Sequence, residues 1–279
     1  MVIWVALPLA ILLLVGFVYW TVVVTEGAYL GPRVVAFLYD WGARTYDQIK
    51  DFDARDEAWF LAQPLARALD GVPHPLILDV ATGTGRLPLA LLRHLDFAGH
   101  IVALDISRGM LHQAARKTAG YRGRVTLMWK DAASLPFVDS AFEAVTCLEA
   151  LEFLPQPLEA LREMVRVLKP GGVFLLTNRV GWEARLMPGR AYEPKCLEEM
   201  LRGLSLRSVE TRTWQEYYDL IWARKGGVLI APNRPRGLMD VLRCPCCQAQ
   251  ELSAGEGSLT CLRCGQLYLR QEGIICLEP

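Results

Sequence analysis

Ile77-Leu78-Asp79-Val80-Ala81-Thr82-Gly83-Thr84-Gly85 is the most informative segment of the 279-residue sequence. Its apolar first half is typical of a buried strand, and its two glycines predict a turn at which the backbone can approach a ligand closely. The next segment, RLPLALLRHL, has the apolar spacing of a helix. Because a helix N-terminus offers unpaired amide groups, the sequence predicts a strand, a ligand-binding turn and a helix in succession.

Alternating strands and helices continue after this turn and imply an α/β fold. LRSVETRTW and YYDLIWARK are typical of a hairpin that closes it. We expect a mainly parallel sheet with helices on both faces over residues 76–225. Helical residues 26–75 would precede it, and a Gly- and Pro-rich linker, residues 226–242, would follow. The other predicted strands are HIVALDIS, RVTLMWKD, FEAVTCL and VFLLTN, and the other predicted helices are RGMLHQAARKTA and Pro157–Lys169.

Two carboxylates near the turn indicate the kind of ligand. Asp105 ends the next strand, twenty residues past Gly85, where a carboxylate can accept both hydroxyl groups of a ribose. A dinucleotide site would have a third glycine in place of Pro88, and Asp79 would repel a pyrophosphate. Asp79 suits a ligand with an ammonium and a sulfonium group. These residues favour S-adenosylmethionine over NAD; the alternative is a tight turn that binds nothing.

Several segments together resemble the class I methyltransferases, in particular the branch of the ubiquinone and menaquinone C-methyltransferases. The resemblance runs from about Tyr39 to Lys225 and rests on LDVATGTG, ALDIS, KDAASLPFVDSAFEAV and LKPGG. It implies a Rossmann-like, seven-stranded methyltransferase sheet flanked by helices. It also implies an enzyme that transfers a methyl group from S-adenosylmethionine.

The resemblance assigns roles to residues around the methionine and ribose parts of the cofactor. Asp79 and Gly83 would lie beside the methionine part, and Asp105 would hold the ribose. Tyr46 and Asp47, in ARTYD, resemble the N-terminal lid that closes over the cofactor in this branch.

The adenine is assigned in the same way. Met110 would line it, Asp131 would meet its amino group, and Ala132 would offer a backbone amide. The alternatives are that Met110 is a core residue and that Asp131 caps the next segment. Ala81 replaces the first glycine of the usual turn. The full set that the resemblance implies is Tyr46, Asp79, Ala81, Gly83, Gly85, Asp105, Ile106, Met110, Asp131 and Ala132.

Methyl transfer needs chiefly proximity, alignment and a dry pocket. A base is needed only if the acceptor must first lose a proton. The loop after the fourth strand is where this fold presents residues to the acceptor, so Glu149 or Glu152 is the hypothetical catalytic base. The alternative is that both are solvated acids at a helix start. Asn178, Arg179 and Trp182 are candidates for the acceptor pocket.

A cysteine-rich unit is predicted at residues 243–279. Cys244-Pro-Cys-Cys247 is followed after thirteen residues by Cys261-Leu-Arg-Cys264, which is a spacing that lets four thiolates converge on zinc. Such a site has no open coordination position, so it would be structural, and Cys246 could replace a neighbouring ligand. Disulfide bonds are the alternative. The unit resembles the zinc ribbons that act as activating partners of certain tRNA, rRNA and translation-factor methyltransferases, which implies a possible protein partner.

The N-terminus is expected to be a membrane anchor, residues 1–25. No charged residue occurs from Val2 to Thr25, a run long enough to span a bilayer as a helix. A signal peptide fits less well because no basic segment or small-residue cleavage site is evident; a buried core helix is the other alternative. Arg33, Arg44 and Lys50 follow the run, which favours a single-pass protein with its catalytic domain in the cytoplasm.

The charge balance bears on the acceptor. The chain has 30 basic and 30 acidic residues, so it lacks the basic excess typical of nucleic-acid binding. We therefore expect a small-molecule or lipid acceptor near the cytosolic membrane surface, and the resemblance favours one of quinone-like chemistry. The alternatives are methylation of a protein or RNA guided by the zinc ribbon, and a non-catalytic membrane adaptor with a methyltransferase fold.

Overall fold

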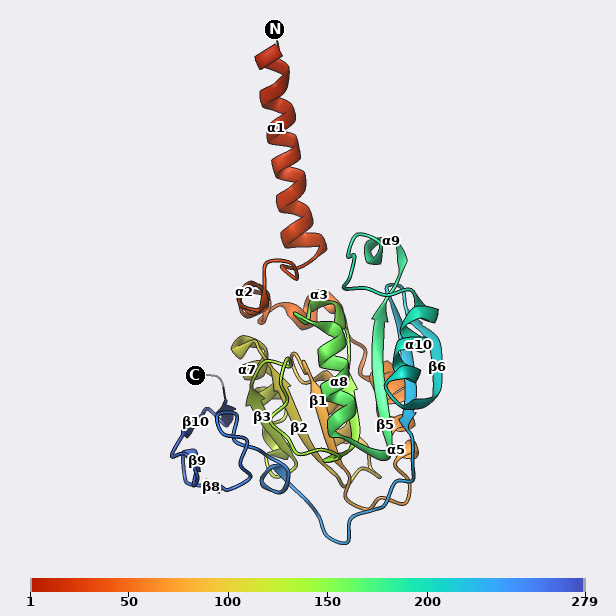
Figure 1. The fold of residues 1–279 in the computed structure, drawn as a ribbon, viewed down its shortest axis with the longest axis vertical. Coiled ribbons are helices and arrows are strands. Elements are labelled where there is room, and N and C mark those ends of the chain that lie inside the picture. Colours follow the sequence, from red (N-terminus) through yellow and green to blue (C-terminus); the bar gives the residue numbers. More distant parts are fainter. Residues whose placement is uncertain (1, 278–279) are drawn as a thin grey trace.

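The computed structural model describes residues 2–277, and the side chains from Leu7 onward. Met1 and the last two residues, which the predicted anchor and zinc unit include, lie outside the described residues. A twisted sheet flanked by helices forms the body of the protein, and helix α1 projects from one end of it (Figure 1).

The sheet of the body confirms the predicted Rossmann-like architecture. Seven strands lie in the order β6-β7-β5-β4-β1-β2-β3, and β7 runs antiparallel to both of its neighbours while the other pairs are parallel. Strand β1 is central and fully buried, as its apolar sequence predicts. The strands are β1 (Leu76–Val80), β2 (His100–Asp105), β3 (Val125–Trp129), β4 (Phe142–Cys147), β5 (Leu168–Arg179), β6 (Leu206–Gln215) and β7 (Tyr218–Lys225).

Helices cover both faces of this sheet. Side chains alternate along a strand, so Leu76 and Leu78 of β1 enter one core and Ile77 enters the other. Helices α8 and α10 pack on the first core, and α6, α7 and α5 pack on the second. Their bounds are α5 (Gln63–Ala68), α6 (Arg86–Arg93), α7 (Arg108–Lys117), α8 (Pro157–Val167) and α10 (Pro194–Gly203), with short helices η3 (Ala119–Tyr121), η4 (Leu151–Phe153) and α9 (Gly181–Ala184) between them.

One boundary differs from the prediction. The helix expected to reach Lys169 ends at Val167, and β5 begins at Leu168. The residue before a proline is disfavoured in helical conformation, which is why the chain becomes extended ahead of Pro170. A register shift between β4 and β5 accommodates this irregular start.

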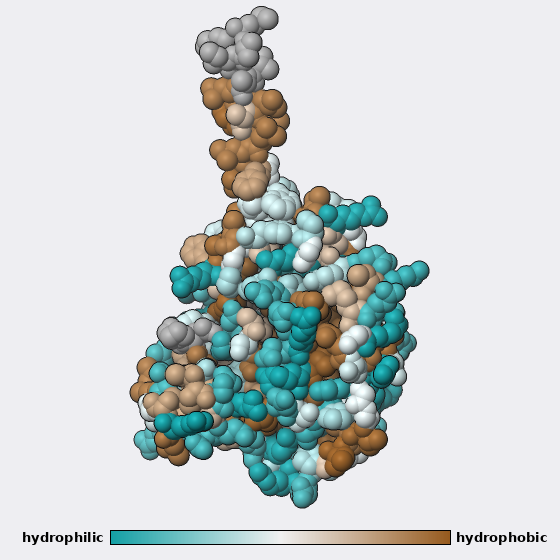
Figure 2. Space-filling model, in the orientation of Figure 1, coloured by the Kyte–Doolittle hydropathy of each residue, from teal (hydrophilic) through white to brown (hydrophobic). Residues whose placement is uncertain are grey.

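The N-terminal part is mainly helical, with turns between its elements. Within residues 2–277, one helix is long and apolar enough to cross a membrane. Its segment Leu7–Val24 has a mean hydropathy of 2.5, and only 11% of that segment is buried. Figure 2 shows its apolar surface standing clear of the body. The elements are α1 (Val2–Tyr19), η1 (Trp20–Val24), α2 (Pro32–Gly42), α3 (Tyr46–Lys50), α4 (Ala54–Asp56) and η2 (Glu57–Ala62).

The cysteine-rich unit is joined to the main sheet, whereas the sequence suggested a separate unit. Its last strand pairs in parallel with β3, with Ile275 opposite Met128, so the sheet continues to eleven strands. The end of the predicted linker also packs into the main core through Leu238, Val241 and Leu242. The added strands are β8 (Leu252–Ala254), β9 (Ser258–Cys261), β10 (Leu267–Gln271) and β11 (Ile274–Cys276), and a short helix, η5 (Leu238–Asp240), precedes them.

Candidate active site and candidate zinc site

A cavity opens at the carboxyl ends of the parallel strands. It measures about 960 Å³ with its mouth included. Its walls come from the turn after β1, the ends of β2 and β3, the loop after β4, and helices α2 and α3. Ligands of open α/β sheets bind at this edge of the sheet, so the cavity is the candidate active site.

Asp105 is anchored at the floor of the cavity. Its Oδ2 accepts a hydrogen bond from the amide of Gly83 at 2.8 Å, and its Oδ1 accepts one from the amide of Ser107 at 2.8 Å. Burial raises the pKa of Asp105 to about 6. Each carboxylate oxygen can accept a further bond, which leaves capacity for two hydroxyl groups.

Asp79 lines the same cavity one strand away. Thr146 donates a hydrogen bond to its Oδ1 at 2.6 Å, and burial raises the pKa of Asp79 to about 6. Ala81 follows with φ of +54°, a left-handed conformation that costs an alanine about 1–2 kcal/mol. This explains in physical terms why a glycine is usual at that position.

The two glycines of the turn have different environments. Gly83 lines the cavity, and a Cβ added there would meet open space. Gly85 does not line the cavity; a Cβ there would lie 3.0 Å from the Cβ of Ala114, so Gly85 lets α6 pack against α7. Met110 is also outside the lining, fully buried within α7.

These environments predict different outcomes for one substitution. Both glycines have positive φ, +55° at Gly83 and +77° at Gly85, so Gly→Ala strains the backbone similarly at each. We expect Gly85→Ala to lose a further 1–3 kcal/mol, roughly, of unfolding free energy because only that Cβ overpacks the helix contact. Denaturant unfolding of the two variants measures the difference, and equal losses would contradict this account of Gly85.

The adenine end of the proposed cofactor site contains Ile106, Asp131 and Ala132, all of which line the cavity. Asp131 accepts a hydrogen bond from the amide of Ala133 at 2.6 Å. The indole of Trp129, at the end of β3, donates to the carbonyl of Ile106 at 2.8 Å. The position of Ile106 therefore depends on β3, which is the strand that pairs with β11.

Helices α2 and α3 close one side of the cavity. Tyr39, Tyr46 and Phe52 all line it. Asp47 fixes α3 to the turn, because its carboxylate accepts from the Thr84 hydroxyl at 2.6 Å and pairs with Lys117 at 2.5 Å. The predicted lid residues are thus in contact with the predicted turn. Tyr39 and Phe52 were not predicted, although the aromatic residues of this segment were an available signal.

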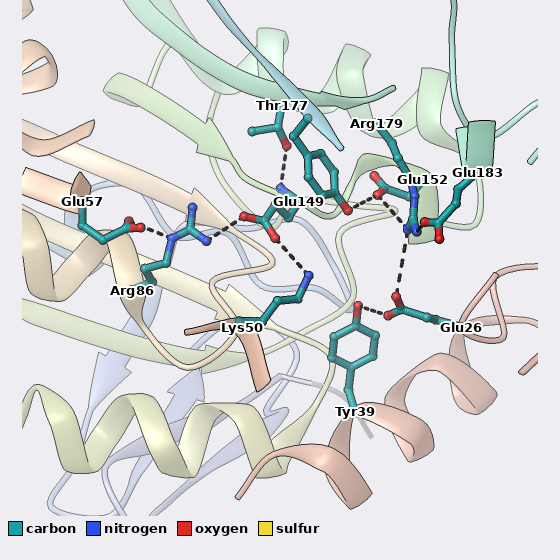
Figure 3. Close-up of polar contacts among 11 residues, drawn as sticks. Glu26, Tyr39, Lys50, Glu57, Arg86, Glu149, Glu152, Thr177, Arg179 and Glu183 are labelled. Atoms are coloured by element: carbon teal, nitrogen blue, oxygen red, sulfur yellow. Dashed lines mark hydrogen bonds and ion pairs between the residues drawn. The ribbon is translucent and has the colours of Figure 1, made fainter. Parts of the chain in front are cut away.

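Glu149 is held by two cations. Its carboxylate lies 2.7 Å from Nη1 of Arg86 and 3.2 Å from Nζ of Lys50 (Figure 3). Burial alone would raise the pKa of Glu149, but the two cations outweigh it and lower that pKa. Arg86 also pairs with Glu57 at 2.7 Å. Glu149 lines the cavity as an ionised group, which makes it a weak base.

Glu152 belongs to a second network and does not line the cavity. It is buried, accepts a hydrogen bond from Tyr218 Oη at 2.5 Å, and lies 3.6 Å from Arg179. Burial raises its pKa. Arg179 also approaches Glu26, which accepts from the hydroxyl of Tyr39 at 2.7 Å (Figure 3). The network links Glu26, two residues after η1, to α2 and to the end of β5.

The other residues proposed for an acceptor pocket lie apart from the cavity. Asn178 donates to the carbonyl of Tyr192 at 2.9 Å, and Trp182 is exposed at the surface. Arg86 was missed by sequence reasoning. A cation in the first turn of a helix opposes the helix dipole, and this was the available signal that Arg86 has specific acidic partners.

Four cysteines converge in the C-terminal unit. The ligand atoms of Cys244, Cys247, Cys261 and Cys264 all lie within 4.8 Å of one another. Cys244 and Cys264 sulfurs are 3.7 Å apart, and those of Cys247 and Cys261 are 3.6 Å apart. Tetrahedral zinc with bonds of about 2.3 Å requires sulfur separations of about 3.8 Å, so these thiols fit zinc and are too far apart for disulfides. Cys246 is exposed and is not part of the group.

Comparison with known proteins agrees with this geometry. Residues 77–172 match the family described as "Methyltransferase domain". This part of the chain is therefore similar to methyltransferase domains, in particular to those of proteins in the quinone C-methyltransferase branch.

Individual relatives show how far the similarity extends. The chain is 38% identical over 147 residues to a demethylmenaquinone methyltransferase of Clavibacter sepedonicus, a match that covers 52% of this chain and 58% of that protein. It therefore spans little more than half the length of this curated relative. The structure of the [4+2]-cyclase SpnF is similar with a TM-score of 0.57 and 22% identity, covering 69% of this chain and 95% of that one.

A chain from the complex between the Haloferax volcanii Trm112 methyltransferase activator and a methyltransferase is similar with a TM-score of 0.51 and 20% identity. That match covers 67% of this chain and 97% of the other. At these identities the two structural matches establish the fold alone.

Proposed function

We propose that the chain transfers a methyl group from S-adenosylmethionine to a lipid or quinone-like acceptor at the cytosolic surface of a membrane. The observation that carries this proposal is the shared cavity of Asp79, Gly83 and Asp105 at the carboxyl ends of β1 and β2. The relative that is similar over this domain is named a demethylmenaquinone methyltransferase, which supports a quinone-like acceptor. The apolar helix α1 supports a membrane location.

Each residue of the cavity has a distinct role in the proposed reaction. When bound, S-adenosylmethionine supplies a methyl carbon already activated by its sulfonium. Asp105 accepts the ribose hydroxyls, and Asp79 places negative charge near the ammonium and sulfonium. The aromatic rings of Tyr39 and Phe52 exclude water from the cavity. Glu149 is the predicted base that lines the cavity, but its lowered pKa makes it a weak base. Alignment of the acceptor with the methyl group therefore contributes more to the rate than proton removal does.

Cofactor affinity should depend on pH. The pKa values of Asp79 and Asp105 are about 6, so both carboxyls are ionised at pH 7.5 and mostly protonated at pH 5. Only the ionised forms attract the ammonium and accept both hydroxyls. Affinity for S-adenosylhomocysteine is therefore greatest above pH 6 and falls as pH drops, about tenfold at pH 5 for each carboxyl that must be ionised.

Calorimetric titration between pH 5 and pH 7.5 measures this dependence. The Asp105→Asn variant serves as the control, since removal of one titrating group should flatten the profile. An affinity that stays constant across this range would contradict the proposed roles of the two carboxyls.

The acceptor class is tested by following the label. The full chain in native membranes is incubated with methyl-labelled S-adenosylmethionine, and lipid, protein and RNA fractions are then separated. We expect the label in the lipid fraction. Label in protein or RNA would instead support the zinc ribbon as a guide to a macromolecular acceptor, and no transfer by a cofactor-binding protein would support the adaptor alternative.

A further inference from the structure

The base of α1 is fixed to the body of the protein. The indole of Trp20 donates a hydrogen bond to the carbonyl of Leu186 at 3.1 Å, and Tyr29 Oη donates to the carbonyl of Pro188 at 2.8 Å. The rings of Trp20 and Tyr29 are stacked with centroids 5.1 Å apart. These contacts join the end of the apolar helix to the segment after α9. The direction of α1 relative to the catalytic domain is therefore set by the fold.

Helix α2 lies across the direction of α1. Figure 1 shows α1 along its length and α2 end-on, at the end of the body from which α1 emerges. Phe37 and Trp41, one helical turn apart, are 68% and 83% exposed. Val35, on the opposite side, is buried. An amphipathic helix that is perpendicular to a membrane span lies in the plane of the membrane surface.

A second apolar group lies on the other side of α1. Trp182 and Leu186 are exposed on the segment that includes α9, which Figure 1 places beside the base of α1. Leu30, between η1 and α2, is also exposed. Exposed basic residues accompany these apolar groups. They are Arg33, Arg44 and Arg185.

We infer that Leu30, Phe37, Trp41, Trp182 and Leu186, here named the juxtamembrane face, rest in the headgroup layer of an anionic bilayer. This inference rests on the proposed membrane location of α1. Tryptophan and other aromatic side chains favour the interface, and the neighbouring arginines favour anionic headgroups. Continuity with α1 selects the bilayer as the occupant of this face.

The face also bears on access to the active site. Pro32 and Val35 of α2 line the cavity, as do Phe153 and Leu154. Val35 and Phe153 pack in one cluster with Met187, which lies in the segment fixed to α1. With the juxtamembrane face in the headgroup layer, this apolar side of the cavity faces the bilayer. An apolar acceptor that enters on this side would come directly from the lipid.

Depth-dependent fluorescence quenching tests the inference. The full chain is reconstituted in vesicles of phosphatidylglycerol and phosphatidylcholine, with or without lipid brominated near the headgroup. Comparison with Trp41→Phe, Trp182→Phe and Trp59→Phe isolates the emission of each of these three tryptophans. Trp59 is the matched control because it is 66% exposed but lies on η2, which packs against α5 and α6. We expect the emission of Trp41 and Trp182 to fall at least twofold with brominated lipid and that of Trp59 to be unchanged.

The outcomes separate this inference from the anchor and from the enzyme. If the protein floats with the vesicles but Trp41 and Trp182 are unquenched, the juxtamembrane face does not contact the bilayer and the inference is overturned. If the protein does not float, the membrane location itself fails and the inference with it. S-adenosylhomocysteine binding by the same preparations reports on the cofactor site independently of either result.

Discussion

Asp105→Ala should lose at least 100-fold in affinity for S-adenosylhomocysteine. Its carboxylate is proposed to accept two ribose hydroxyls, and hydrogen bonds to a charged group contribute about 1.5–3 kcal/mol each. Two such bonds correspond to roughly 100-fold or more, at 1.4 kcal/mol per factor of ten. The substitution also removes the acceptor for the Gly83 amide, so the turn loses its anchor as well.

Titration calorimetry on the full chain in detergent measures this loss. Asp105→Asn keeps the shape of the side chain and should lose less, because an amide oxygen can still accept one bond. Asp70→Ala, at an exposed position away from the cavity lining, is the control and should bind as the unaltered protein does. Unchanged affinity in folded Asp105→Ala would remove Asp105 from the cofactor site.

Removal of the zinc ion that we propose for the four cysteines should unfold the C-terminal unit and weaken the main sheet at the same time. The unit shares part of the main core through residues such as Leu259 and Ile275, but it is small, so a bound zinc ion would supply much of its folding free energy, which is about 10–16 kcal/mol for zinc-finger peptides. The loss extends beyond the unit because β11 pairs with β3, and the amide of Leu277 donates to the carbonyl of Trp129 at 3.1 Å. Trp129 in turn holds the carbonyl of Ile106 in the cavity wall.

Chelation or Cys261→Ser should therefore lower both the melting temperature and the affinity for S-adenosylhomocysteine. Cys246→Ser is the matched control, since Cys246 lies between Cys244 and Cys247 in the sequence but is outside the cluster. Metal analysis and thermal melting are measured for each variant. A chelated protein that melts and binds as before would show that the unit does not support the catalytic domain.

The sheet and the turn were predictable because their signals are local. LDVATGTG specifies a strand, a turn and a helix start within nine or so neighbouring residues, and the structure has all three. The cysteine cluster was predictable for the same reason, since the spacing of the two knuckles determines where the thiols converge. Residue type and spacing sufficed in both cases.

Long-range contacts were not predictable in this way. The last strand has an ordinary apolar pattern that does not encode β3 as its partner, so the sequence suggested a separate unit. Glu152 and Tyr218 are 66 positions apart, and only the fold brings them to hydrogen-bonding distance. Gly85 and Met110 show a related limit. Both residues lie next to the cofactor motifs, as predicted. Helix packing determines their roles, however, because Gly85 allows α6 to pack against α7 and the side chain of Met110 is buried within α7.

The proposed function depends first on whether the cavity binds an adenosyl ligand. Calorimetric titration of the full, zinc-loaded chain with S-adenosylhomocysteine, beside a titration with NAD, tests this. We predict saturable binding of S-adenosylhomocysteine near one equivalent and no heat from NAD. Absence of S-adenosylhomocysteine binding by the folded protein would contradict the enzyme proposal and leave the membrane adaptor as the better account.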